Sequence, residues 1–177
     1  WASRSPRERG EILRKAFELF SNRIDDIADL ITLENGKGRT DSIGEARYAA
    51  EFFRWYAEEA VRSEGHLGVA PATGARILVH QKPAGISVLV TPWNYPAAMG
   101  TRKIGPALAA GCPVIVKPAS ETPLTMLALM PILEEAGVKD GGEWIVAEGV
   151  ESVKGASTIP MIKAMDDTLL AYSMNGE

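Results

Sequence analysis

The chain has 177 residues and a formal net charge of −4, with 24% charged and 46% hydrophobic residues. This length suits one main hydrophobic core. The absence of a basic stripe argues against a nucleic-acid partner, and no apolar run reaches the roughly 18 residues of a membrane span. We therefore expect a soluble, cytoplasmic protein that binds neither nucleic acid nor membrane. One cysteine and two histidines are too few for a disulfide framework or a cysteine-rich metal site.

The first third of the chain predicts three helices. Ser5 and Glu8 have the spacing of a capping box, which marks the start of the first helix. Apolar residues then recur at three- and four-residue intervals, with an interruption near residues 21–22 and a stop at Asn35-Gly36, and this pattern indicates two helices. A third helix is expected from about Asp41 to Gly65.

From Arg76 onward the pattern changes to short strands that alternate with helices. The predicted strands are 76–81, 86–90 and 113–116, and the predicted helices run from about 97 to 110 and from 122 to 137. The run 86–90 is apolar throughout, which predicts an interior strand. The alternating order of strands and helices implies parallel strands with right-handed crossovers, so the predicted class is α/β.

Polar side chains follow the ends of two of these strands. Asn94 comes after strand 86–90, and Lys117 and Ser120 come at the end of strand 113–116. Ligands of open α/β sheets bind beyond the carboxyl ends of such strands, so we expect these residues at one site. Taken alone, Asn94 is either a turn former or an N–H donor to an oxyanion. Lys117 is either a solvated surface cation or a contact to ribose or phosphate.

Two further residues have competing interpretations. Arg102 lies about two turns into the helix after Asn94, where it either faces solvent or clamps a carboxylate in the same crevice. Cys112 precedes a buried strand with no histidine nearby in sequence, so we interpret it as a packed, inert thiol. The segment Glu34-Asn35-Gly36-Lys37 has the pattern of an ordinary helix stop, and no Gly-x-Gly-x-x-Gly or Walker loop occurs.

Three motifs, in this order, resemble the aldehyde dehydrogenase superfamily: Thr91–Pro96, Gly105–Cys112 and Lys117–Pro123. The Glu34-x-Gly36-Lys37 element is also similar, so the resemblance covers about residues 1–140. It implies that residues 1–141 are part of the family's Rossmann-like cofactor-binding domain, with a parallel sheet behind a helical N-terminal segment.

The same resemblance has consequences for assembly and completeness. Residues 67–82 resemble part of the family's oligomerisation hairpin, which implies a homo-oligomer. Residues 142–177 are left as an unassigned tail, because the family's later Gly-rich turn, glutamate base and cysteine nucleophile are not found there. The chain begins with Trp1 rather than methionine, so we interpret it as part of a longer protein, truncated, frameshifted or fused after residue 141.

The family oxidises aldehydes to acids with NAD or NADP, through a cysteine thiohemiacetal and hydride transfer. By resemblance, Asn94 would be the catalytic donor to the oxyanion, and Arg102 would bind the distal carboxylate of succinate semialdehyde, as in the succinate-semialdehyde dehydrogenases. Gly100 departs from the larger apolar residue expected in that subgroup, which should loosen the helix that carries Arg102. The implied cofactor-binding residues are Thr91, Pro92, Trp93, Asn94, Lys117, Pro118, Ala119 and Ser120.

The resemblance also has implications for the cofactor and for activity. Ser120 stands where NAD-preferring members often have a glutamate that repels a 2′-phosphate, so the implied cofactor is NADP, with NAD as the alternative. A full-length parent is expected to be active and the 177-residue chain alone inactive. The competing hypothesis is a noncatalytic nucleotide-binding or scaffolding fragment of the same fold.

Overall fold

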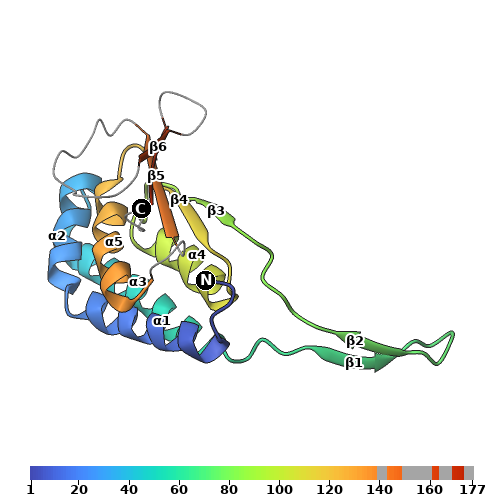
Figure 1. Cartoon of the computed structure of the whole chain (residues 1–177). Helices are drawn as coiled ribbons and strands as arrows, with labels where there is room; N and C mark the ends of the chain where they lie inside the picture. Colours follow the sequence, from blue (N-terminus) through green and yellow to red (C-terminus); the bar gives the residue numbers. More distant parts are fainter. Residues whose placement is uncertain (139–142, 149–160, 164–168, 174–177) are drawn as a thin grey trace.

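The structure, a computed structural model, describes residues 1–138, 143–148, 161–163 and 169–173, with side chains described for residues 1–138. A body of helices packed on a sheet carries a long hairpin that projects from one side (Figure 1). The helices are α1 (Pro6–Ser21), α2 (Ile24–Asn35), α3 (Arg39–Glu59), α4 (Ala98–Ala109) and α5 (Leu124–Ala136). The strands are β1 (His66–Val69), β2 (Arg76–Val79), β3 (Ser87–Val90), β4 (Val114–Lys117), β5 (Glu143–Glu148), β6 (Met161–Lys163) and β7 (Leu169–Ser173). The expected α/β class is confirmed.

The local signals at the helix ends act as predicted. The Ser5 hydroxyl accepts a hydrogen bond from the Glu8 amide, and the Glu8 carboxylate accepts one from the Ser5 amide, so the capping box is complete. Helix α2 ends at Gly36, whose φ of 76° is left-handed and therefore favours glycine. The third helix, however, ends at Glu59 rather than at Gly65, because the chain must straighten to enter β1 at His66.

The main sheet has the strand order β3-β4-β5-β7-β6. Strands β3, β4 and β5 are parallel, as the alternation of strands and helices predicts, while β7 and β6 are antiparallel additions that the sequence did not reveal. The predicted domain boundary at residue 141 lies outside the described residues, and the division into 1–141 and 142–177 stays a prediction.

Strand β3 corrects one expectation, because it lies at the edge of the sheet and not in its interior. Its partner within the described residues is β4 alone, and the side chains of Val88 and Val90 are 66% and 57% exposed. The run is continuously apolar because its side chains lie on both faces of the sheet. Such a run does not show how many strands lie beside it.

The helices cover the sheet and form most of the buried core (Figure 1). Phe20 of α1 and Phe53 of α3 meet edge to face with their ring centroids 6.3 Å apart. Helix α3 also packs along α4, and α5 packs against α1. No helix among the described residues combines the length and the apolar character needed to cross a membrane.

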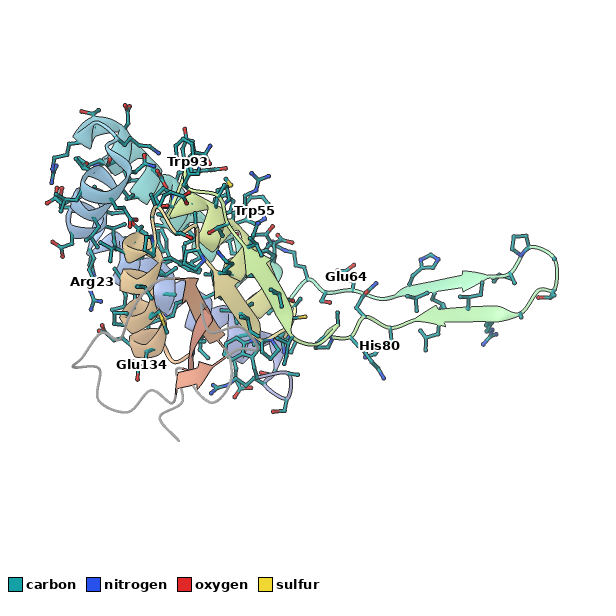
Figure 2. The ribbon with its side chains drawn as sticks, turned by 90° about the horizontal axis from the view of Figure 1, so that it is seen from above. Arg23, Trp55, Glu64, His80, Trp93 and Glu134 are labelled. Atoms are coloured by element: carbon teal, nitrogen blue, oxygen red, sulfur yellow. The ribbon has the colours of Figure 1, made fainter. Side chains whose placement is uncertain are left out.

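Strands β1 and β2 pair antiparallel, with His66 opposite Val79, and form an arm that extends well beyond the body. Figure 2 shows Glu64 and His80 at the base of this arm, with both strands leading away from the helices. Its apolar side chains are largely solvent-exposed, among them Leu67 (71%) and Leu78 (79%). The predicted strand at 76–81 is therefore present as β2, two residues shorter than expected.

Two glycines within helices α1 and α3 provide a matched test of helix packing. A Cβ atom on Gly10 would lie 2.7 Å from the backbone oxygen of Ala57, whereas a Cβ atom on Gly44 would meet nothing within 4 Å. Gly10→Ala should therefore push α1 away from α3 and lower the free energy of unfolding by about 1–3 kcal/mol. Gly44→Ala should raise it by about 0.5–1 kcal/mol, because alanine has the higher helix propensity. Urea denaturation of both variants measures the difference, and equal effects would contradict the close approach of α1 and α3.

Candidate active site

Two loops meet at one edge of the sheet, where strands β3 and β4 end. Val90 pairs with Lys117 in the parallel register, and the Thr91 amide donates a hydrogen bond to the Lys117 carbonyl at 3.1 Å. Asn94 therefore follows the end of β3, Lys117 is the last residue of β4 and Ser120 follows it. That the three residues form one site stays a prediction. The loop after β3 is residues 91–97 and is called the Asn94 loop below.

The side chains at this edge are open to solvent. Trp93 is 57% exposed, and Asn94 and Ser120 are also exposed, while Lys117 is half-buried and its Nζ donates to the Pro118 carbonyl at 3.4 Å. Trp93 stands out from the body in Figure 2. A ligand can therefore reach the amide of Asn94 and the hydroxyl of Ser120 without displacing buried side chains.

The backbone of the Asn94 loop is held from outside. The Trp93 carbonyl accepts a hydrogen bond from the Asn35 side-chain amide at 2.9 Å and another from the Thr122 hydroxyl at 3.3 Å. Asn35 is the last residue of α2, and Thr122 belongs to the loop after β4. Two separate parts of the chain therefore fix the turn that presents Asn94.

A carboxylate from α2 caps helix α5. Both oxygens of Glu34 are used: Oε2 accepts from the Leu124 amide at 2.7 Å and Oε1 from the Thr125 amide at 2.9 Å. The N-cap residue of α5, Pro123, makes no side-chain cap of its own. Glu34 thus supplies partners for amides that the helix leaves unsatisfied, and its negative charge is favourable at a helix N-terminus.

Helix α4 has the same kind of cap from a different carboxylate. Oε1 of Glu45, on α3, accepts from the amides of Ala97 at 2.9 Å and Ala98 at 3.3 Å. The Glu45 side chain is fully buried, and its other oxygen pairs with the Lys37 ammonium at 2.5 Å. Lys37 also donates to the Asn94 carbonyl at 3.0 Å.

These caps affect whether a phosphate can bind at the N-termini of α4 and α5. In dinucleotide-binding folds, the first helix N-terminus after a strand commonly receives the pyrophosphate. Here the N-termini of α4 and α5 already hold the carboxylates of Glu45 and Glu34. A phosphate would find these amides already bound to carboxylates, and the sequence also lacks a Gly-rich phosphate loop.

Arg102 is exposed on α4, one turn beyond the helix start. Its predicted role toward a substrate carboxylate is compatible with this exposure and stays a prediction. Its neighbour Lys103 bonds to the Val90 carbonyl at the end of β3, which ties α4 to the strand. A Cβ atom on Gly100 would lie 1.9 Å from the end of the Met126 side chain, so a larger residue at this position would require Met126 to move. The expected loosening of the helix stays a prediction.

Cys112 is buried, with 6% of its surface exposed, as expected for a packed thiol. Among the described residues, no group of three or more His, Cys, Asp or Glu side chains is placed to hold a metal ion. A hollow of about 410 Å³ lies beside the Asn94 loop. It is lined by Lys37, Thr40, Asp41, Gly44, Glu45, Tyr48 and Tyr95.

Sequence reasoning missed the residues that support the site. The segment Glu34-Asn35-Gly36-Lys37 is a helix stop, as interpreted, but Asn35 and Lys37 also bind the Asn94 loop, and Glu34 binds the first two amides of α5. Their partners lie 57 to 91 residues away in the chain. The sequence did contain one signal for these contacts. The segment Glu34-Asn35-Gly36-Lys37 carries charged side chains that the end of a helix does not need.

This chain is similar to known proteins along most of its length. The sequence model of the Aldehyde dehydrogenase family matches residues 1–165. Succinate-semialdehyde dehydrogenase of Paenarthrobacter nicotinovorans is 45% identical over 176 residues, which cover 99% of this chain and 38% of that protein. Succinate-semialdehyde dehydrogenase [NADP(+)] 1 of Schizosaccharomyces pombe is 44% identical over 164 residues, covering 92% of this chain and 33% of that protein.

Solved structures give the same result. The crystal structure of succinate-semialdehyde dehydrogenase from Burkholderia pseudomallei superimposes with a TM-score of 0.78 at 45% identity, covering 82% of this chain and 30% of that chain. The chain thus spans about a third of the length of the relatives it matches. With a family match over most of its length and the fold of that family in its helices and sheet, the chain belongs to the aldehyde dehydrogenase family.

Proposed function

We propose that a full-length protein containing this chain oxidises succinate semialdehyde to succinate with NADP. The observation that carries the proposal is the meeting of the Asn94 loop with the Lys117–Ser120 loop at the ends of β3 and β4. The names of the relatives support the substrate class and the cofactor, since one of them is an NADP-dependent succinate-semialdehyde dehydrogenase.

In this proposal Asn94 is the catalytic donor. Its side-chain amide is exposed and would donate a hydrogen bond to the negative oxygen that develops when a nucleophile attacks an aldehyde. One such donor stabilises the transition state by about 3 kcal/mol in comparable sites. The side chains of Asn35 and Lys37 donate hydrogen bonds to the backbone carbonyls of Trp93 and Asn94. These bonds would hold the loop that carries the donor in place before substrate arrives.

The cofactor would lie along the same edge of the sheet. Lys117 would bind the adenosine ribose, and Ser120 would leave room for a 2′-phosphate. Trp93 and Asn94 would border the nicotinamide, which accepts a hydride when it is bound. The remaining contacts in the proposal are Thr91, Pro92, Pro118 and Ala119. The exposure of Trp93, Asn94 and Ser120 supports this proposal, and the carboxylates at the two helix N-termini would leave the phosphates to bind elsewhere.

The competing proposal is a noncatalytic nucleotide-binding or scaffolding fragment. It is supported by the burial of Cys112, which leaves no accessible thiol among the described residues. For the same reason we propose that the 177-residue chain alone does not oxidise aldehydes. The cytoplasmic location expected from the sequence stays a prediction.

The cofactor assignment is tested by Ser120→Glu in the full-length protein. A carboxylate near the 2′-phosphate adds repulsion of about 1 kcal/mol or more, so KM for NADP should rise roughly tenfold while KM for NAD changes little. Ser120→Gln, which has nearly the same size without the charge, is the control. Equal losses for both cofactors, or equal effects of Glu and Gln, would contradict the assignment.

The substrate assignment is tested by Arg102→Ala in the same protein. Loss of a charge-assisted contact should weaken the binding of succinate semialdehyde by about 2–3 kcal/mol, which lowers kcat/KM mainly through a higher KM. The kcat/KM for butanal should stay nearly unchanged. Arg102→Lys keeps the charge but not the bidentate geometry and should lie in between. If both aldehydes lose equally, Arg102 is structural and the substrate reverts to an unspecified aldehyde.

We also propose that the protein forms a homo-oligomer through the β1–β2 arm. Its exposed leucines and the unpaired outer edges of a two-stranded sheet favour pairing with another chain. Leu67→Lys with Leu78→Lys should shift the chain toward the monomer in sedimentation velocity at high concentration. Leu33→Lys, which alters an 80% exposed leucine on α2, is the control. An unmodified chain that remains monomeric at high concentration would argue against assembly through the arm.

A further inference from the structure

We propose that Lys37 is a positioning residue that holds the Asn94 peptide, so that the Asn94 amide is presented at a fixed place. The inference rests on the proposed function of Asn94 as oxyanion donor. It assigns a task to a side chain outside both site loops, on the segment that follows α2.

Lys37 contacts the Asn94 loop in two ways. Its Nζ donates to the Asn94 carbonyl at 3.0 Å and lies 3.8 Å from the centroid of the Tyr95 ring. The Lys37 side chain is 15% exposed. An ammonium that has lost most of its water gains more from these contacts than an exposed one does.

The direction of the Asn94 side chain depends on its backbone. The side chain is exposed, so packing does not fix it. The loop is held at Trp93 by Asn35 and at Ala97 by Glu45. Between these two anchors, the hydrogen bond from Lys37 restrains rotation of the peptide that follows Asn94.

Lys37 has a second partner, which makes a simpler explanation possible. It neutralises the buried Glu45 carboxylate that caps α4. Loss of Lys37 would leave that charge unpaired and destabilise the protein whether or not Asn94 were affected. The test must therefore remove the charge on Glu45 as well.

The double variant Lys37→Met with Glu45→Gln separates the two roles. Glutamine keeps an oxygen that accepts from the Ala97 and Ala98 amides, and no buried charge remains unpaired. Lys37→Met alone should be the least stable protein, and the double variant should recover most of the melting temperature. Glu45→Gln alone keeps the bond from Lys37 to Asn94 and is the reference for catalysis.

In the full-length protein, kcat of the double variant should fall by between about tenfold and a hundredfold relative to Glu45→Gln, since small misplacements of a catalytic group have effects of this size. KM for NADP should change less than kcat, because the adenosine contacts proposed for the Lys117–Ser120 loop are untouched and only the proposed nicotinamide contacts lie in the Asn94 loop. Lys15→Met is the matched control, since the exposed Lys15 also donates to a backbone carbonyl, that of Glu135, far from the site. A double variant with the kcat of Glu45→Gln would overturn the inference.

A second measurement does not depend on activity. In the 177-residue chain, the Tyr95 amide nitrogen belongs to the peptide whose carbonyl Lys37 binds, so its ¹⁵N resonance reports that bond. The resonance should differ between Glu45→Gln and the double variant, while Ala98 changes little. An unchanged Tyr95 resonance would show that Lys37 does not restrain the peptide between Asn94 and Tyr95. If Asn94→Ala leaves kcat unaltered while Tyr95 responds, the proposed role of Asn94 fails but the hold by Lys37 stands.

Discussion

The capping of helices α4 and α5 by carboxylates from distant helices is the interaction on which the site depends. Each helix begins immediately after a site loop, and neither has an N-cap side chain of its own. Glu45 and Glu34 supply the missing acceptors from α3 and α2. The N-terminal helices therefore do more than cover the sheet, because they fix where both loops end and both following helices begin.

This solution has a consequence for ligand binding. A helix N-terminus whose amides already bind a glutamate is a weaker site for a phosphate, and this applies to both α4 and α5. What remains at the edge is the exposed amide of Asn94, the hydroxyl of Ser120 and the cation of Lys117. In the proposed function, these groups would contact the sugar and nicotinamide parts of the cofactor.

Local features of this fold could be predicted from the sequence, and long-range ones could not. The capping box at Ser5 and the left-handed Gly36 depend on residues within a few positions, so their patterns sufficed. The strand ends at Asn94 and Lys117 followed from the parallel alternation. The edge position of β3 did not, because an apolar run does not record the number of neighbouring strands, and Val88 and Val90 of this run are exposed. The hydrogen bonds that the Thr125 amide donates to Glu34 and the Ala97 amide donates to Glu45 join residues 91 and 52 positions apart, which no local pattern encodes.

The two caps also differ in a way that explains Lys37. Glu34 is partly exposed, so water can stabilise its charge, and its two amide contacts suffice. Glu45 is fully buried, and a buried carboxylate is stable only beside a cation. The cation that meets this need comes from the segment after α2, directly beneath the Asn94 loop. Once it is there, its remaining donors can bind the Asn94 carbonyl, so a requirement of packing also restrains the loop that presents the amide.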